Sequence, residues 1–300
     1  MNATAPDSFR CGLVALGGRT NVGKSTLLNR LVGRKVSIVT PRPQTTRRRV
    51  LGVRHEPDAQ LLLVDMPGLH LPRGLLNQQM TALARRCLAE ADVLVGVIEA
   101  GPALGAGDKA FLTEMLEYRM PKVIAINKID RVKRLSFLPV AQQCAQLVAD
   151  AEIVPISALT GENVDRLVEV IKRFLPHRQP LMAQQEYTDQ SELTIAQEII
   201  REKIFFAVRE EVPFSTAVKI DEFTFDTERE LLRITATIVV ERESQKGILI
   251  GAGGLRLKQI GQSAREELEA LFNRRIFLTL FVKVDKNWTR DPRKVAELAG

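Results

Sequence analysis

The stretch Gly18-Arg19-Thr20-Asn21-Val22-Gly23-Lys24-Ser25 determines the fold that we expect for the first half of the chain. It fits the pattern G-x-x-x-x-G-K-[ST] and lies between an apolar run, residues 12–16, and a helix-forming segment, residues 26–32. In that context, successive backbone N–H groups face the phosphates of a nucleotide at a helix N-terminus. We predict that Lys24 reaches the β- and γ-phosphate oxygens and that the Ser25 hydroxyl holds Mg²⁺. The loop residues expected to contact the nucleotide are Gly18, Asn21, Val22, Gly23, Lys24, Ser25 and Thr26.

The composition indicates a globular protein of about two domains, since the 300 residues are 45% hydrophobic and 26% charged. No run of about 18 apolar residues is present, so a membrane-spanning helix is not expected. Residues 1–10 lack the apolar core of a signal peptide. The three cysteines, Cys11, Cys87 and Cys144, lack the spacing of a metal site, and buried, unreactive thiols are the better interpretation. These features predict a cytoplasmic protein.

Positive charge is concentrated in two parts of the chain, although the net charge is only +7. Residues 1–176 carry 24 Lys and Arg against 16 Asp and Glu. Residues 177–241 are acidic, with seven against 13, whereas residues 242–294 are basic, with 12 against six. A surface that binds a polyanion would produce such a basic terminal region, but an ordinary solvated surface would produce it as well.

Apolar runs alternate with amphipathic segments between residues 50 and 174. This alternation predicts an α/β domain with a mainly parallel sheet and helices on both faces. Ligands of such sheets bind at the carboxyl ends of the strands, so the polar residues that follow the strands are candidates for one common site. The expected strands are residues 50–54, 61–65, 93–98, 122–126 and 153–156, and the expected helices are residues 108–118, 138–149 and 164–174.

The second of these strands ends in Asp65-Met66-Pro67-Gly68. A carboxylate at a strand end, followed by a glycine whose N–H can approach a phosphate, suits a sensor of the γ-phosphate. We predict that Asp65 binds Mg²⁺ through a water molecule and that Gly68 contacts the γ-phosphate. Residues 41–49 contain two prolines and the pair Thr45-Thr46, and they are expected to form an exposed loop.

The stretch Asn127-Lys128-Ile129-Asp130 is expected to select the base. A carboxylate such as Asp130 can accept hydrogen bonds from guanine N1–H and from its exocyclic amine, whereas adenine offers neither donor there. Lys128 would lie along the base plane, and Asn127 would support the purine and connect loops. Ser157-Ala158-Leu159 would complete the pocket with backbone N–H groups directed toward guanine O6.

These motifs resemble, in order, the five motifs of Ras-like GTPases, and two stretches resemble the bacterial Era family in particular. The stretches are residues 21–29, NVGKSTLLN, and residues 44–47, QTTR. The resemblance implies that Thr46, rather than Thr45, is the switch threonine on Mg²⁺. It also implies GTP, GDP and Mg²⁺ as ligands. The catalytic residues would be Lys24, Thr46, Asp65 and Gly68, and the metal would be held by Ser25, Thr46 and, through water, Asp65.

Two features of the resemblance concern hydrolysis. Leu69 follows Gly68 where many GTPases have a glutamine that orients the attacking water, so slow intrinsic hydrolysis is expected. Asn21 is expected to coordinate a monovalent cation, K⁺, beside the phosphates, as in related GTPases. Thr20 replaces the proline usual in the family, which should leave the phosphate contacts intact.

The second half of the chain resembles a K-homology domain of the bacterial type II, an α+β fold. Its expected elements are a helix over 192–211, strands over 217–220 and 231–240, a short helix, a G-x-x-G loop, a helix over 255–271 and a strand over 275–284. We therefore expect a GTPase domain over 1–176, a polar linker over 177–190 and an RNA-binding domain over 191–300. The residues expected to bind RNA are Ile250, Gly251, Ala252, Gly253, Gly254, Arg256 and Lys258.

The second domain departs from the family in its loop, where Ala252 and Gly253 stand in place of the usual lysines. Backbone N–H groups and flanking basic residues must then contact the RNA phosphates, and a weaker dependence of binding on salt is expected. Residues 283–293 form a basic C-terminal tail that contains the only tryptophan, Trp288. Trp288 would either anchor the tail on the domain or stack on a base.

By resemblance, the RNA would be the 3′ end of small-subunit ribosomal RNA, during assembly of the small ribosomal subunit. The protein would be a monomer and would contact the inner membrane peripherally, without a transmembrane segment. An alternative is a signalling GTPase whose second domain docks a protein or membrane partner. Asn127 and Asp130 argue against an ATPase or kinase, and the single phosphate loop argues against the double-GTPase Der type.

Overall fold

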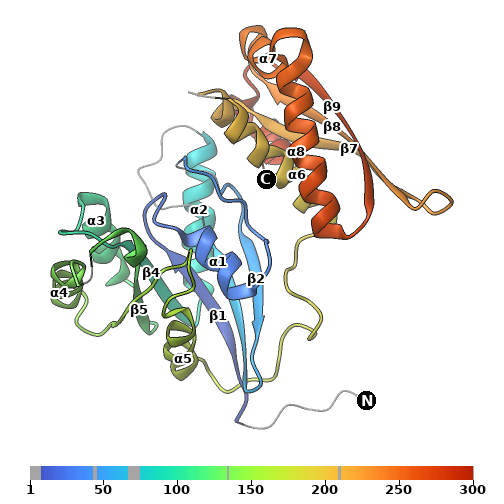
Figure 1. Cartoon of the computed structure of the whole chain (residues 1–300). Coiled ribbons are helices and arrows are strands. Elements are labelled where there is room, and N and C mark those ends of the chain that lie inside the picture. Colours follow the sequence, from blue (N-terminus) through green and yellow to red (C-terminus); the bar gives the residue numbers. More distant parts are fainter. Residues whose placement is uncertain (1–7, 43–45, 67–74, 134, 209–210, 300) are drawn as a thin grey trace. The chain divides into compact units, whose positions relative to one another are not determined.

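Figure 1 shows the computed structural model, which describes residues 8–42, 46–66, 75–133, 135–208 and 211–299. Within these ranges the chain forms two compact units. The first contains residues 8–37, 46–66 and 79–189, and the second contains residues 38–42, 75–78 and 190–299. None of the helices in the described ranges is both long enough and apolar enough to cross a membrane.

The first unit is built on a six-stranded sheet with the strand order β2-β3-β1-β4-β5-β6. Strands β1 and β3 to β6 run parallel, and β2 pairs antiparallel with β3. The strands read as nearly continuous apolar runs because both faces of the sheet are covered. Their bounds are β1 (Arg10–Gly17), β2 (Val50–His55), β3 (Ala59–Asp65), β4 (Val93–Glu99), β5 (Lys122–Asn127) and β6 (Glu152–Pro155).

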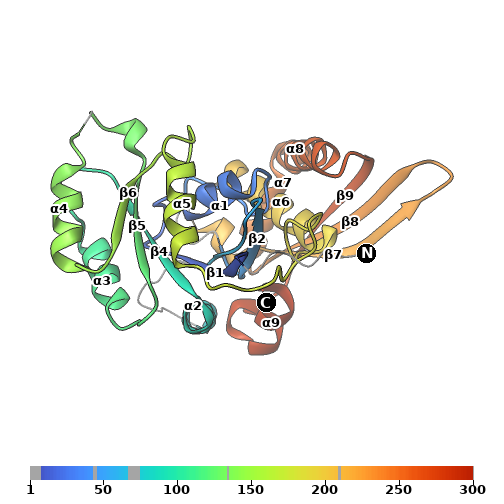
Figure 2. The same cartoon turned by 90° about the horizontal axis from the view of Figure 1, so that it is seen from below.

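Helices cover both faces of this sheet (Figure 2). On one face, Leu27 and Leu31 of α1 pack with Leu167 and Ile171 of α5, at the helical spacing of an apolar stripe. The other face packs against α2, α3 and α4. The predicted α/β fold with a mainly parallel sheet is therefore confirmed. The bounds are α1 (Lys24–Val32), α2 (Leu75–Glu90), α3 (Ala106–Met115), η1 (Ile129–Arg131), α4 (Leu138–Leu147) and α5 (Val164–Phe174).

The three cysteines lie in the second of these two cores as free, buried thiols. Burial raises the pKa of Cys11 and Cys87, and it raises the pKa of Cys144 to about 11. A thiol with a raised pKa carries little thiolate and reacts slowly. The expectation that the cysteines are buried is confirmed, and their low reactivity stays a prediction that the raised pKa values support.

The segment between residues 177 and 189 packs along the first unit. The side-chain carbonyl of the buried Gln60 accepts hydrogen bonds from the N–H groups of Leu181 (2.8 Å) and Met182 (3.0 Å). The hydroxyl of Thr188 donates to the carbonyl of Leu51 at 2.6 Å. A polar sequence is thus fixed in place by polar contacts with β2 and β3, which composition alone did not indicate.

The second unit has a three-stranded sheet with the order β7-β8-β9. Strand β8 pairs antiparallel with β7 and parallel with β9. Apolar side chains of α6 and α8 pack on one face of the sheet, including Ile200, Ile204, Ile260 and Leu268. The element order matches the predicted type II K-homology fold. The bounds are α6 (Glu192–Ala207), η2 (Val212–Ser215), β7 (Ala217–Asp226), β8 (Leu231–Val240), α7 (Glu243–Ile250), η3 (Ala252–Gly254), α8 (Leu255–Phe272), β9 (Arg275–Val284), η4 (Trp288–Arg290) and α9 (Pro292–Ala299).

Helix α6 ends four residues earlier than the predicted helix over 192–211. Ser191 begins the helix, because its side chain accepts a hydrogen bond from the N–H of Thr194. Val208 adopts an extended backbone and is buried in the core, so the helix ends at Ala207. The sequence pattern stays helical past this point because the buried Val208 and Val212 are both apolar.

The basic C-terminal segment is folded onto the second unit, where η4 and α9 follow β9. Trp288 is fully buried and packs with Val295 and Leu298 of α9. Its indole N–H donates to the carbonyl of Ser215 at 3.0 Å. Of the two roles considered for Trp288, the structure therefore shows the anchor and not an exposed platform for a base.

We expect Trp288→Ala to destabilise the second unit by about 3–5 kcal/mol, because it leaves a large cavity in a small core. Trp288→Phe keeps most of the apolar volume but leaves the Ser215 carbonyl without its donor, and should cost about 1–3 kcal/mol. Urea unfolding of the full chain, followed by circular dichroism, measures both effects. Equal stability of the two variants and the wild type would contradict the anchoring role.

Candidate functional site

The phosphate loop, residues 18–25, has a backbone that only glycine adopts easily at two positions. Gly18 has φ 140° and Gly23 has φ 101°. A Cβ at Gly18 would lie 2.4 Å from the carbonyl oxygen of Val97, and one at Gly23 would lie 2.3 Å from the side-chain nitrogen of Asn127. The loop therefore packs against β4 and the end of β5, and its last two residues, Lys24 and Ser25, already belong to α1.

Lys24 is buried at the loop, and its ammonium group faces the concave side of the backbone. Its Nζ donates to the carbonyl oxygens of Gly18 at 3.1 Å and Arg19 at 2.9 Å. Burial lowers the pKa of Lys24, and the nearby Asp65 carboxylate partly opposes that effect. A buried ammonium with carbonyl partners at a helix N-terminus is suited to hold an anion.

Asp65 is the centre of a cluster of hydroxyl groups. Its Oδ2 accepts hydrogen bonds from the hydroxyls of Ser25 at 2.5 Å, Ser37 at 3.1 Å and Thr46 at 3.4 Å. Its Oδ1 is buried and has no hydrogen-bond partner among the described residues. Burial raises the pKa of Asp65, and Lys24 and the hydroxyls act in the opposite direction. A buried carboxylate with an unpaired oxygen next to hydroxyls offers the oxygen donors that Mg²⁺ prefers.

Ser37 is a member of this cluster that the sequence analysis missed. The side chain of Asn29, on α1, fixes its position. Asn29 Oδ1 accepts from the N–H groups of Val36 and Ser37, both at 2.9 Å, and Asn29 Nδ2 donates to the carbonyl of Ser37 at 2.7 Å. The available signal was Asn29 itself, which ends the stretch NVGKSTLLN.

The residues expected to read the base lie together at the ends of β5 and β6. Asn127 donates to the carbonyl of Val22 at 2.8 Å and accepts from the N–H of Ala158 at 2.9 Å, so it connects two loops as predicted. Lys128 Nζ donates to the carbonyl of Asn21 at 2.7 Å. The Ser157 hydroxyl donates to Asp130 Oδ1 at 2.6 Å. Ser157 thus orients the carboxylate, a contribution of its side chain that the prediction had not included.

Four charged side chains link the base loop to the phosphate loop. Glu99, at the end of β4, lies 3.0 Å from Lys128 Nζ and 2.7 Å from Arg19 Nη2. Arg19 Nε also lies 2.9 Å from Asp108. Burial would raise the pKa of Glu99, but the hydrogen bonds and charges of Lys128 and Arg19 outweigh it and lower that pKa. Glu99 and Asp108 belong to no motif, and only the tertiary structure reveals their part in the site.

Several predicted residues lie outside the described residues. Gly68, expected to contact the γ-phosphate, is one of them, as are Leu69 and Thr45. Thr46 is described and lies in the Asp65 cluster, where its hydroxyl is 3.3 Å from that of Ser25. In the described part of the chain, no three His, Cys, Asp or Glu side chains gather as a metal site. The cluster around Asp65 brings together Ser25, Thr46 and Asp65, the residues predicted to hold Mg²⁺, and that role stays a prediction.

In the second unit, the glycine-rich loop joins α7 to α8. Ile250 ends α7, and Ala252–Gly254 forms the short turn η3. Gly253 has φ 56° and Gly254 has φ 77°, and a Cβ at either position would meet no atom within 4 Å. The outer side of this loop is therefore open, so a ligand backbone can approach it closely.

A groove of about 450 Å³ begins at this loop. One wall is α8, which contributes the basic residues Lys258 and Arg265, and the other wall is β9. Gly261 faces β9, and a Cβ there would make an ordinary contact with the Leu280 side chain at 3.5 Å. The residues that line the groove are Gly254, Leu257, Lys258, Gly261, Gln262, Arg265, Leu278 and Leu280.

The two basic residues predicted to contact RNA, Arg256 and Lys258, have different surroundings in the structure. Lys258 is exposed and lines the groove. The guanidinium of Arg256 instead donates to the carbonyl of Ile248, near the end of α7, and so braces the loop. Sequence reasoning missed Arg265, which lies seven residues after Lys258 on α8, and it missed the leucines of β9 because a strand distant in the sequence forms the second wall.

Two protein-family models match the chain. The family described as 50S ribosome-binding GTPase matches residues 13–128. The family described as KH domain matches residues 211–289. The second match lies within the second unit, and the first covers mostly residues of the first unit together with residues 38–42 and 75–78 of the second.

The chain is similar over nearly its whole length to curated and solved proteins. It is 44% identical over 289 residues to GTPase Era of Syntrophus aciditrophicus, which covers 96% of this chain and 94% of that protein. A crystal structure of Era with MgGDPNP and nucleotides 1506–1542 of 16S ribosomal RNA has a TM-score of 0.93 and 41% identity, and covers 97% of this chain and 98% of that chain. A variant of Aquifex aeolicus Era bound to GDP.AlF4⁻ has a TM-score of 0.91 and 40% identity, and covers 97% and 99%.

Proposed function

The chain belongs to the Era family of GTPases, and we propose that it is a GTP-controlled protein whose second unit binds the 3′ end of small-subunit ribosomal RNA. It is a GTPase that uses GTP, GDP and Mg²⁺. What we propose is the role of each site residue, the identity of the RNA, and the control of RNA binding by GTP.

For the nucleotide, we assign the phosphates to the loop of residues 18–25 and the guanine to Asn127, Lys128 and Asp130. The Lys24 ammonium would neutralise charge on the β- and γ-phosphate oxygens, and the Asp130 carboxylate would accept from guanine N1–H and the exocyclic amine. Ser25, Thr46 and Asp65 would hold Mg²⁺, which supplies charge neutralisation on the phosphates when it is bound. The unpaired, buried Oδ1 of Asp65 supports this assignment.

Catalysis in this arrangement depends on positioning and charge. In the described residues, the hydrogen-bond partners of the Lys24 and Asp65 side chains are backbone carbonyls and hydroxyl groups, none of which is a general base at neutral pH. We therefore keep the prediction of low intrinsic hydrolysis. The roles of Gly68 and Leu69 and the K⁺ site at Asn21 also stay predictions.

For the RNA, the groove between α8 and β9 is the observation that carries the proposal. It combines an open glycine-rich loop, basic side chains from Lys258 and Arg265, and apolar walls from Leu257, Leu278 and Leu280. Single-stranded RNA is bound in this way, with its backbone at the loop and its bases against an apolar wall. The solved Era complex contains a 16S ribosomal RNA fragment, which supports the choice of ligand.

We expect Lys258→Ala and Arg265→Ala each to weaken binding of an RNA that spans nucleotides 1506–1542 of 16S ribosomal RNA. Each substitution should also reduce the slope of log affinity against log salt by about 1, because each side chain neutralises one phosphate. Fluorescence anisotropy at several salt concentrations measures both. Lys109→Ala, on α3 of the first unit, removes an equal charge and should change neither.

A loop variant separates RNA binding from docking of another partner. The double variant Gly253→Asp, Gly254→Asp places negative charge where the phosphates would lie. Aspartate tolerates the left-handed backbone better than most residues. The double variant should lose RNA binding while keeping GTP binding, whereas Gly101→Asp, in open space in the first unit, should keep both. Intact RNA binding by the double variant would favour the signalling alternative, in which the second unit docks a protein or membrane.

The cellular role is proposed on the same basis. We propose that the protein acts in small-subunit assembly in the cytoplasm, as a monomer, and contacts the inner membrane only peripherally. Crosslinking of bound RNA in cells, followed by sequencing, tests the role. Enrichment of small-subunit ribosomal RNA in the wild type, and its loss in the Gly253 and Gly254 double variant, is the expected result.

A further inference from the structure

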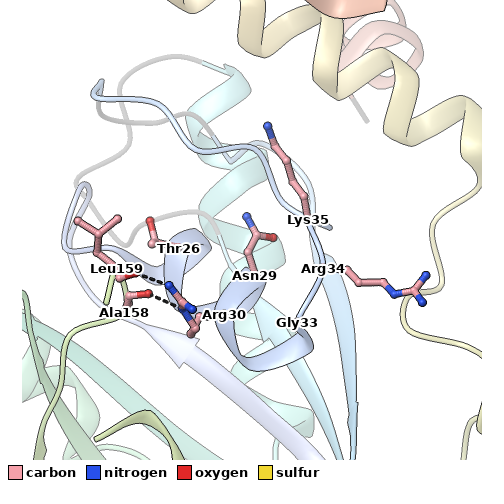
Figure 3. Close-up of a pocket in the computed structure, with 8 residues that line it drawn as sticks. All are labelled: Thr26, Asn29, Arg30, Gly33, Arg34, Lys35, Ala158 and Leu159. Atoms are coloured by element: carbon pink, nitrogen blue, oxygen red, sulfur yellow. Dashed lines mark hydrogen bonds between the residues drawn. The ribbon is translucent and has the colours of Figure 1, made fainter. Parts of the chain in front are cut away.

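Arg30 connects the helix of the phosphate loop to the loop expected to read guanine O6. It lies on α1, which begins at Lys24, and a hollow of about 330 Å³ opens beside it. Figure 3 shows its guanidinium directed at the base loop. Arg30 Nε donates to the carbonyl of Ala158 at 3.2 Å, and Nη2 donates to the carbonyl of Leu159. One rigid, planar group thus holds two successive carbonyls.

The hydrogen bond to the Ala158 carbonyl orients the Ala158–Leu159 peptide group, and the one to the Leu159 carbonyl holds the next peptide group. In a planar trans peptide, the carbonyl of one residue and the N–H of the next point in opposite directions. The carbonyl of Ala158 points at Arg30, so the N–H of Leu159 points away from the guanidinium. Loss of the Arg30 contact would remove the donor of the Ala158 carbonyl and so weaken the restraint on this peptide.

The N–H of Leu159 is also the donor that the base loop leaves open. The N–H of Ala158 is bonded to Asn127 Oδ1 at 2.9 Å, and the N–H of Thr160 to the Ser157 hydroxyl at 3.1 Å. The N–H of Gly161 is bonded to the carbonyl of Ser157 at 2.8 Å. No hydrogen bond among the described residues involves the N–H of Leu159, which lies two residues after Ser157, whose hydroxyl is bonded to Asp130.

We propose that Arg30 is a positioning residue for base recognition, which orients the Ala158–Leu159 peptide so that its N–H reads guanine O6. The inference rests on the guanine site of the proposed function. Arg30 itself touches neither the base nor the phosphates in this scheme. Its effect is therefore confined to the part of the affinity that depends on O6.

The test compares three nucleotides by isothermal titration calorimetry of the full chain with Mg²⁺. GDP has all the guanine groups, 6-thio-GDP replaces O6 with a poorly accepting sulfur, and IDP lacks the exocyclic amine that Asp130 would bind. In the wild type, GDP should bind about 5- to 10-fold more tightly than 6-thio-GDP. In Arg30→Met, which keeps the apolar stem but no donors, this ratio should fall close to one, while the ratio of GDP to IDP stays unchanged.

Two further variants sharpen the result. Arg30→Lys keeps one donor and should restore part of the O6 preference. Arg34→Met is the matched control, since Arg34 lines the same hollow but points away from the base loop (Figure 3). Equal weakening of all three nucleotides in Arg30→Met, or unchanged ratios, would overturn the inference alone. Absence of GDP preference over IDP in the wild type would overturn the guanine site itself.

Discussion

Replacing Asp130 with Asn should shift the base preference of the protein from guanine to xanthine. The Asp130 carboxylate is held by the Ser157 hydroxyl at 2.6 Å, so its direction is fixed before a base arrives. An asparagine there presents an N–H₂ group toward two guanine donors, and both would be left unpaired. Two lost hydrogen bonds to a charged group at about 1.5 kcal/mol each correspond to a loss of GTP affinity of about 100-fold or more.

Xanthosine triphosphate should gain affinity in the same variant. Its C2 carbonyl accepts a hydrogen bond from the amide that replaces the carboxylate. Competition between GTP and xanthosine triphosphate, measured by nucleotide displacement, gives the ratio directly. Asp165→Asn, on the exposed side of α5, is the charge-matched control and should leave GTP binding unchanged. An Asp130→Asn protein that still prefers GTP would remove Asp130 from the guanine site.

The parts of the site that could be predicted are those encoded by short, contiguous stretches. The loop of residues 18–25 needs glycines at fixed positions because a Cβ at Gly18 or Gly23 would collide with the next strands. Asn127 ends β5 and Asp130 follows it closely. A parallel sheet brings the carboxyl ends of its strands to one edge, so these residues were expected near the phosphate loop. Local spacing and the sheet's rules were enough to place them together.

The missed residues act through contacts between distant segments. Arg30 and the Ala158 carbonyl are 128 positions apart in the chain, and Gln60 and Leu181 are 121 positions apart. Each residue has an ordinary type for its element, so nothing local distinguishes it. In the sequence, Glu99 is only the last residue of an apolar strand. Its connection to the site becomes visible in the structure, where it pairs with Arg19 and Lys128.

The C-terminal helix shows a different limit of sequence reasoning. Residues 283–293 are rich in basic side chains, and that composition is typical of a solvated tail. Three apolar residues, Trp288, Val295 and Leu298, nevertheless suffice to pack α9 against Ala217 and Val239 of the sheet. A few large apolar side chains can hold a segment in place although its average composition is polar, because the burial energy depends on the area that each side chain buries.

Replacing Asp65 with Asn should weaken Mg²⁺ binding by about 10- to 100-fold, the range typical for loss of a residue that orients a metal's ligands. The amide is neutral and presents N–H donors to a cluster whose three hydroxyls, from Ser25, Ser37 and Thr46, donate to Oδ2. GTP hydrolysis by this variant should then require correspondingly more Mg²⁺. Single-turnover hydrolysis across a Mg²⁺ titration measures the shift.

Ser37→Ala provides the comparison that separates charge from hydrogen bonding at Asp65. It removes one donor from Oδ2 at 3.1 Å but leaves the carboxylate and its unpaired Oδ1 in place. If the carboxylate charge attracts the metal, Ser37→Ala should shift the Mg²⁺ requirement only a few-fold, far less than Asp65→Asn. Equal shifts in the two variants would mean that the hydroxyl network, rather than the charge of Asp65, controls the metal. An unchanged requirement in Asp65→Asn would place the metal elsewhere.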